Sequence, residues 1–221
     1  MEMIILGITL LITLGAQSYI NSSYNRTKTI MASKHLSGKE VARKILDANG
    51  LKHIKVVEQE GVLTDHYDPK NKIVRLSTDI YNNKSLASVS VASHECGHAI
   101  QDKDNYFFLR LRSSIVPLVN LASTLGYVAI MIGLLAGILN FLRIGIALEF
   151  VILAFQLITL PVEFNASSRA LKQITELGIV TADEHRNCRQ MLTAAALTYV
   201  AAVATAVLQI LRLVLIARGR D

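Results

Sequence analysis

Two histidines and a glutamate in the segment His94-Glu95-Cys96-Gly97-His98 have the spacing of a metal-dependent catalytic site. On an α-helix, residues i and i+4 lie on one face about a turn apart, so His94 and His98 can direct their imidazoles at one cation. Neutral imidazole nitrogens suit Zn²⁺. Glu95 is then placed to take a proton from a water at the metal, as a general base. The alternative is simple packing in a helix of small residues, but burying these polar groups without partners is costly, which favours metal binding.

A catalytic zinc site needs a third protein ligand and keeps one position open for water. We expect Glu163 to be that ligand, because a carboxylate at the end of an apolar run needs a partner and a metal is a good one. Pro161, just before it, could start the helix that carries it. The alternative is an interfacial Glu163 that pairs with Arg169. The other candidates for the third ligand are His53, His66, Asp68 and His185.

Four apolar runs predict membrane helices, since a span needs roughly 20 mainly apolar residues. The runs cover residues 3–20, 115–140, 145–162 and 192–211. The whole chain is 52% hydrophobic and only 18% charged, against about a quarter charged in soluble chains. The first run has no basic segment before it and no A-x-A site after it, which favours a retained anchor over a cleaved signal peptide.

These runs and the segments between them predict a mainly α (α+β) integral membrane protein with a small zincin-like cytoplasmic domain. The predicted parts are an anchor at 1–20, a metalloprotease domain at 21–114, two transmembrane helices at 115–162, a cytoplasmic helix with the third metal ligand at 163–191, and a last transmembrane helix at 192–217. Residues 21–114 and 162–191 share one side of the membrane and hold 19 of the 23 Lys and Arg residues. By the positive-inside rule, that side is the cytoplasm.

The polar domain shows local signals for helices and strands. Ser37 followed by Glu40 is a capping box that predicts a helix over 37–50, which Gly50 ends. Segments 53–63 and 72–77 alternate enough to predict two short strands in a hairpin or small sheet, with a turn at 68–71. The next helix, over about 85–101, carries the His-Glu-x-x-His motif.

The cysteines and the net charge suggest no further chemistry. Cys96 and Cys188 lie on the predicted cytoplasmic side, where thiols stay reduced, and we interpret both as packing residues. The net charge of +6 is explained by the topology bias and by anionic lipid headgroups in the bilayer. No basic and aromatic stripe predicts a nucleic-acid partner.

Four segments resemble the YugP-type neutral zinc metallopeptidases of bacterial membranes: HECGHAIQ at 94–101, TDHYDP at 64–69, PVEFNASSRA at 161–170 and AAALTYVA at 194–201. The match extends over nearly the whole chain. More distantly, the layout resembles the HtpX-type membrane metalloproteases. The resemblance implies one Zn²⁺ per chain held by His94, His98 and Glu163, Glu95 as general base, and a location in the bacterial cytoplasmic membrane with the active site facing the cytoplasm.

Two positions depart from these families. HtpX-type enzymes have a carboxylate one helical turn after the ligand Glu, where this chain has Ser167, and it supports a His ligand. The YugP-type pattern usually has Asp where this chain has Asn165. Arg169 could take a similar orienting role or bind lipid phosphate. Both positions concern residues that hydrogen-bond to the metal ligands. Loss of such a partner typically lowers metal affinity or activity about 10–100-fold.

The predicted activity is that of a gluzincin-like zinc metalloendopeptidase acting on a peptide or a membrane protein. An extended substrate could pair with the strand near residues 63–77. The sequence does not identify the group that stabilises the oxyanion: His66, His185 and Tyr199 are candidates, but residues of these types are more often structural than catalytic. The main alternative is a non-proteolytic membrane scaffold or adaptor with a retained metal site. A metal transporter is disfavoured, because the spans contain almost no buried ligands. Small residues in the spans would permit close packing with a membrane partner protein or a second copy; they are Gly133, Gly137, Ala201 and Ala202.

Overall fold

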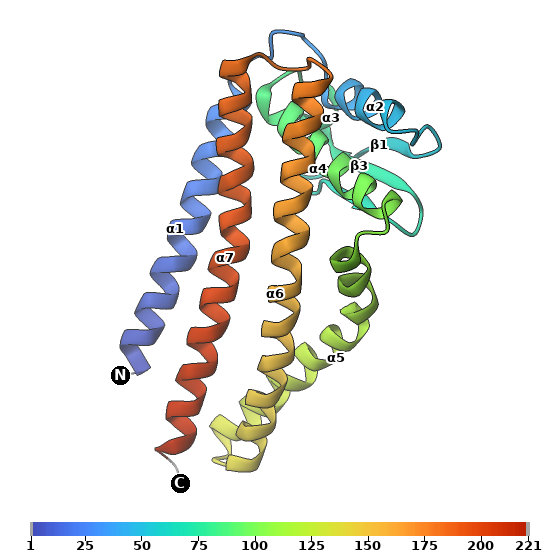
Figure 1. Cartoon of the computed structure of the whole chain (residues 1–221). Coiled ribbons are helices and arrows are strands. Elements are labelled where there is room, and N and C mark those ends of the chain that lie inside the picture. Colours follow the sequence, from blue (N-terminus) through green and yellow to red (C-terminus); the bar gives the residue numbers. More distant parts are fainter. Residues whose placement is uncertain (1, 220–221) are drawn as a thin grey trace. The chain divides into compact units, whose positions relative to one another are not determined.

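The computed structural model describes residues 2–219 and divides into two compact units. We call residues 1–17, 110–161 and 197–221 the membrane unit, and residues 18–109 and 162–196 the polar unit. Four long helices contribute to both units: α1 (Glu2–Lys28), α5 (Phe107–Leu135), α6 (Leu139–Glu176) and α7 (Ala182–Arg218) (Figure 1). The shorter helices and all strands belong to the polar unit.

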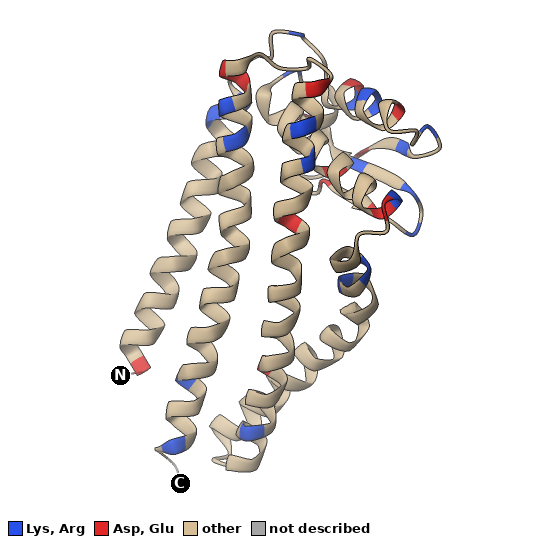
Figure 2. Cartoon of the chain, in the orientation of Figure 1, with Lys and Arg blue, Asp and Glu red and all other residues tan. Residues whose placement is uncertain are grey.

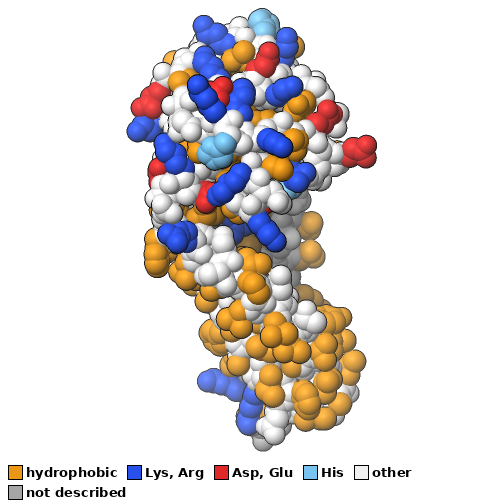
Figure 3. Space-filling view, turned by 90° about the vertical axis from the view of Figure 1, so that its right-hand side faces the viewer, with side chains coloured by type: hydrophobic (Ala, Val, Ile, Leu, Met, Phe, Trp, Pro, Cys, Tyr) orange, Lys and Arg blue, Asp and Glu red, His pale blue; other side chains and the backbone are white. Residues whose placement is uncertain are grey.

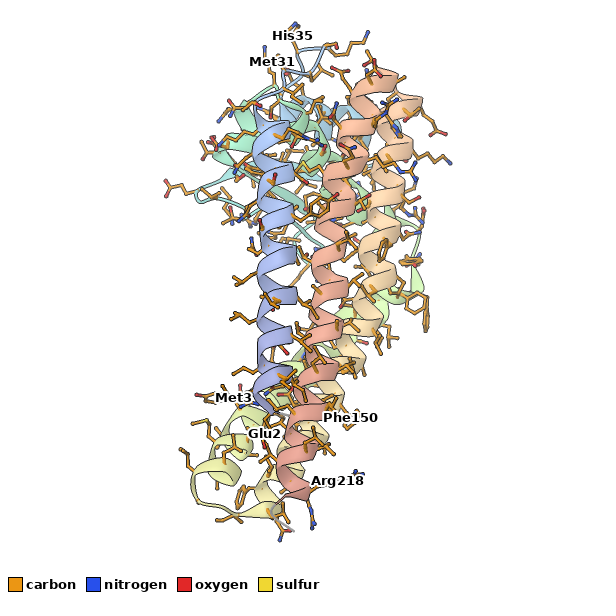
Figure 4. All side chains as sticks on the ribbon, turned by 90° about the vertical axis from the view of Figure 1, so that its left-hand side faces the viewer. Glu2, Met3, Met31, His35, Phe150 and Arg218 are labelled. Carbon is orange, nitrogen blue, oxygen red and sulfur yellow. The ribbon has the colours of Figure 1, made fainter. Side chains whose placement is uncertain are left out.

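All four long helices have the length and composition to cross a membrane, as the sequence predicted. Their most apolar windows have mean hydropathies between 1.9 and 2.3. Figure 2 shows that charged residues are rare along their apolar parts and frequent over the polar unit. Hydrophobic side chains cover the apolar helices on the face drawn in Figure 3. Met3 on α1 and Phe150 on α6 are both exposed (Figure 4), which suits contact with lipid.

The connection between α5 and α6 differs from the predicted run 115–140. Helix α5 ends at Leu135, and Asn140 belongs to α6. Gly137 lies between them with φ +71°, a conformation that favours glycine. Close helix packing occurs instead at Gly133, where an added Cβ would lie 2.6 Å from the backbone nitrogen of Leu142. Gly133 therefore packs closely within the chain, against the start of α6, and Gly137 lies in the connection between the two helices.

Pro161 does not start a helix, contrary to the sequence interpretation, because it lies inside the continuous helix α6. A proline removes one helical hydrogen bond, and long membrane helices tolerate this where neighbouring groups satisfy the freed carbonyl. The predicted single helix over 163–191 is also wrong. That segment comprises the end of α6, a turn at 177–181 and the start of α7.

Two helices and their caps form the centre of the polar unit. Helix α2 (Gly38–Ala48) begins with the predicted capping box, in which Ser37 and Glu40 satisfy each other's backbone groups. Helix α4 (Leu86–Lys103) begins after Ser85, whose hydroxyl accepts from the backbone nitrogen of Ser88. The two helices pack against each other (Figure 1), and the apolar face of α2 is buried in that contact. Its buried residues include Val41, Ala42, Ile45 and Leu46.

Three short strands form the predicted sheet, in the order β1-β3-β2. They are β1 (Lys55–Gln59), β2 (His66–Asp68) and β3 (Ile73–Ser77). The hairpin joins β2 to β3 through a turn in which the Asp68 carboxylate accepts from the backbone of Lys70 and Asn71. The two strands predicted from segments 53–63 and 72–77 pair in parallel and so do not form a hairpin. A short helix, α3 (Thr78–Asn82), follows β3.

This order corrects the expected position of a substrate strand. β3 has a neighbour on each side, so its backbone groups are largely paired already. Within residues 63–77, only β2 lies at an edge of the sheet. Met31 and His35 lie in the connection between α1 and α2 (Figure 4), where Met31 forms a single bridge with Ser85.

Candidate metal centre

Within the polar unit, helix α4 and the last part of helix α6 bring three potential metal ligands together. Helix α4 carries His94 and His98 one turn apart, and α6 carries Glu163. Among residues 2–219, one donor atom from each of these side chains lies within 4.8 Å of the other two. Glu163 Oε2 is 3.3 Å from His94 Nε2 and 3.6 Å from His98 Nε2. The predicted group of three is therefore assembled in the structure.

The spacing and chemistry of this group fit zinc. A tetrahedral Zn²⁺ with its ligands at about 2.0–2.1 Å places neighbouring donors roughly 3.3–3.4 Å apart. The two distances to Glu163 are close to that value. The rings of His94 and His98 are nearly perpendicular, at 87°, with centroids 4.8 Å apart, so both present a nitrogen to the same point without stacking. Two imidazoles and a carboxylate leave a fourth position for water.

The close approach of α4 to α6 depends on the glycine inside the motif. A Cβ added at Gly97 would lie 2.4 Å from the carbonyl oxygen of Ala166. Only a residue without a side chain fits there, because real Cβ contacts do not reach this distance. Gly97 lies between the two histidines in sequence, and Ala166 is three residues after Glu163. This contact therefore brings the carboxylate to the imidazoles.

Each histidine has a polar partner on the side of the ring away from Glu163. Ser167 Oγ lies 3.2 Å from His94 Nδ1, and Gln101 Oε1 lies 3.0 Å from His98 Nδ1. Ser167 was identified in the sequence as a departure from the carboxylate of HtpX-type enzymes, and the structure places it against a histidine. Gln101 was not predicted from the sequence as a partner of His98. Its spacing of three residues from His98 indicates the contact, because this spacing puts both residues on one face of α4.

Glu95 is separate from the three donors. It is 8% exposed and does not belong to the group of three donor atoms. Burial opposes protonation of His98, but the protonated ring can donate to Glu163, and this bond together with the negative charges of Glu95 and Glu163 raises the pKa of His98 above its ordinary value. The same negative charges favour a metal cation at this place.

None of the other candidate ligands joins this group. His53 and His66 are exposed, and His66 Nδ1 lies 2.8 Å from the backbone carbonyl of Thr64. Asp68 is occupied in its own turn. His185 lines a cavity of about 360 Å³ between α6 and α7, together with Ser167 and Arg189. Tyr199 belongs to the membrane unit.

Arg169 and both cysteines also have defined surroundings. The alternative pairing of Glu163 with Arg169 is wrong, because Arg169 donates to Asn165 and Asp104. Cys96 and Cys188 are buried and free, as predicted. Burial raises the pKa of the Cys96 thiol well above its usual range, so this thiol stays protonated and serves packing.

Comparison with known proteins agrees with this geometry. The family described as "Putative neutral zinc metallopeptidase" matches residues 2–218. The "Putative membrane protease YugP" of Bacillus subtilis (strain 168) is 45% identical over 207 residues, which cover 93% of this chain and 92% of that protein. No solved structure matches the chain. The resemblance noted from the motifs is thus confirmed, and with it the expectation of zinc and of a membrane location. The chain belongs to the family of neutral zinc metallopeptidases.

Proposed function

We propose that this chain is a membrane-embedded zinc metalloendopeptidase of the gluzincin-like type. His94, His98 and Glu163 hold the zinc, and Glu95 is the general base. The observation that carries the proposal is the convergence of the three donor atoms from two helices within 4.8 Å. A zinc ion bound there supplies Lewis acidity and lowers the pKa of a water to about 7.

The residues of the chain perform the proton transfers. The Glu95 carboxylate takes a proton from the attacking water and then delivers it to the leaving amine, so one group serves as base and then as acid. Glu95 follows the ligand His94 on α4 and is not one of the three donors, so its carboxylate is left to act on a water. General acid–base catalysis of this kind contributes typically about 10²–10⁴-fold.

Strand β2 is our proposed docking edge for an extended substrate. It is short, lies at the edge of the sheet, and contacts α4 through Tyr67, whose hydroxyl donates to Asp102 at 2.7 Å. Pairing along a strand edge uses backbone groups, so it suits a peptidase acting on peptide segments or on exposed parts of membrane proteins.

The predicted parts of the chain give the proposed topology. Residues 21–114 and 163–191 face the cytoplasm of a bacterial cell, and residues 1–20, 115–162 and 192–217 cross its membrane. The excess of Lys and Arg in the polar segments supports this orientation. A single added cysteine at exposed Lys52 should react with a membrane-impermeant thiol reagent in inverted vesicles and stay unlabelled in intact cells.

Purified protein in detergent tests the proposed site. Wild type should carry one zinc and cleave casein. Glu95→Gln should keep the zinc and lose at least about 10²-fold in kcat/KM, whereas Glu60→Gln, at an exposed carboxylate of the same unit, should leave both unchanged. Glu163→Ala should lose the zinc, and Glu176→Ala, an exposed glutamate on the same helix, should not. A Glu95→Gln protein as active as wild type would remove the catalytic role and leave the scaffold interpretation.

A further inference from the structure

Gln101 connects the candidate metal centre to a chain of buried hydrogen bonds. Its side chain is fully buried. Its oxygen Oε1 faces His98 Nδ1 at 3.0 Å, and its nitrogen Nε2 lies 2.7 Å from the carbonyl oxygen of Val162 and 3.0 Å from Asn165 Oδ1. Asn165 Oδ1 in turn lies 2.7 Å from Arg169 Nε. Every polar atom of the Gln101 amide therefore has a partner.

The direction of each hydrogen bond in this chain follows from groups whose roles are fixed. An arginine side chain can only donate, so the Asn165 atom that faces Arg169 must be its oxygen. A backbone carbonyl can only accept, so the Gln101 atom that faces Val162 must be its nitrogen. That nitrogen also donates to Asn165 Oδ1. The Gln101 oxygen is then the atom left to face His98, and it can only accept.

We propose that Gln101, held in place by Asn165 and Arg169, is a positioning residue that fixes the tautomer of His98. Because Gln101 Oε1 accepts, His98 Nδ1 must carry the hydrogen, and the lone pair of the neutral ring is on Nε2, the atom that faces Glu163. This is the atom that a metal needs. The inference rests on the proposed function for the identity of the metal ligands, but the direction of the hydrogen bonds does not depend on it.

The two histidines differ in this respect. Ser167 Oγ, the partner of His94, can donate or accept, so it leaves the tautomer of His94 open. The hydrogen bonds behind His98 run from Gln101 through Asn165 to Arg169. Arg169 also forms an ion pair with Asp104, the residue that follows α4. This series of bonds therefore links the end of α4 to α6 and holds the His98 ring between them.

Asn165 acts in this arrangement only through its oxygen, which receives both donors. Aspartate at this position would offer the same acceptor. Asn165→Asp should therefore preserve the hydrogen bonds. Leucine at this position has no acceptor, so it would leave Gln101 free to rotate and Arg169 without one partner.

Zinc affinity, measured by competition with a chromophoric chelator, tests the role of Gln101 without requiring activity. Gln101→Met and Asn165→Leu should weaken zinc binding about 10–100-fold, while Asn165→Asp stays within a few-fold of wild type. Gln173→Met is the control, since Gln173 accepts a comparable bond from Asn49 elsewhere on α6, and its zinc affinity should not change. Equal affinities for wild type, Gln101→Met and Asn165→Leu would overturn the proposal, and so would an Asn165→Asp protein as impaired as Asn165→Leu.

Nitrogen NMR of ¹⁵N-histidine-labelled protein gives a readout that is independent of zinc and of proteolysis. In zinc-free wild type at alkaline pH, the His98 resonance, assigned with His98→Gln, should report a hydrogen on Nδ1. Gln101→Met should give a mixture of tautomers. A hydrogen on Nε2 in wild type would overturn the proposal even if the protein is an active zinc protease. Conversely, if the protein binds no zinc but His98 carries its hydrogen on Nδ1, the proposed series of hydrogen bonds would be supported while the proposed function would fail.

Discussion

Gly97 and Ala166 set the distance between the helix of the two histidines and the helix of Glu163, because a Cβ at Gly97 would lie 2.4 Å from the Ala166 carbonyl oxygen. Gly97→Ala should therefore push α6 away from α4 and weaken zinc binding. Overpacking of this kind costs about 1–3 kcal/mol of stability.

The control for this substitution is Gly15→Ala on α1, where an added Cβ meets nothing within 4 Å. In Gly97→Ala, zinc affinity and the thermal unfolding midpoint should both fall. In Gly15→Ala, zinc affinity should stay unchanged and the midpoint should stay the same or rise slightly. An unchanged zinc affinity in Gly97→Ala would show that α4 and α6 can separate without disturbing the donors.

What the sequence predicted correctly was encoded in short stretches. The capping box of Ser37 and Glu40 and the placement of His94 and His98 one turn apart on a helix depend on local geometry, so residue spacing alone predicts both. The prediction of Glu163 rests on its position at the end of an apolar run, where a carboxylate needs a partner. In the structure its carboxylate lies next to both histidines.

What it missed depends on contacts between distant segments. β1 pairs in parallel with β3, and β2 lies along the other edge of β3, an order that the alternation of side chains does not reveal. Pro161 was read as a local helix start, but the surrounding helix continues through it. The partner of Gln101 is on α6, more than 60 positions away, so no periodicity along α4 could predict it.

Ser167→Ala tests the support of His94. The substitution removes one hydrogen bond, which typically contributes about 0.5–1.5 kcal/mol, and zinc affinity should fall by roughly 2- to 10-fold. This is a smaller loss than that expected for Gln101→Met, because the Ser167 hydroxyl does not fix the tautomer of its histidine. The neighbouring Ser168→Ala, at an exposed position on α6, serves as the control. A larger loss in Ser167→Ala than in Gln101→Met would reverse this ranking of the two supports.

The capping box of α2 predicts a specific dependence on pH. The Glu40 carboxylate accepts from the backbone nitrogen and the hydroxyl of Ser37, both at 2.8 Å, and these bonds hold the pKa of Glu40 below its ordinary value of 4.5. Since the pKa is lower in the folded than in the unfolded chain, the stabilisation is complete above pH 4.5 and is lost as pH falls through the folded pKa.

Ser37→Ala should accordingly lower the free energy of unfolding by about 1 kcal/mol at neutral pH. The difference from wild type should shrink as the pH is lowered below 4.5, where Glu40 becomes protonated in both proteins. Thermal unfolding midpoints of the two proteins in detergent, followed by circular dichroism across this range, give the comparison. A difference that stays constant into acid would mean that the hydroxyl acts on the helix end without the carboxylate.

Removal of the metal should destabilise the polar unit through the same three side chains that bind it. A ligand present at about 100 times its Kd, and bound only by the folded chain, adds about 2.7 kcal/mol to the free energy of unfolding. Wild type should therefore unfold at a lower temperature after chelation, and zinc should restore the midpoint. Glu163→Ala should show no zinc-dependent change, because the carboxylate that lies between His94 and His98 is missing. Glu176→Ala removes a glutamate at the exposed end of the same helix and should respond as wild type does. If Glu163→Ala still gained the full stabilisation from zinc, the third ligand would have to come from another residue.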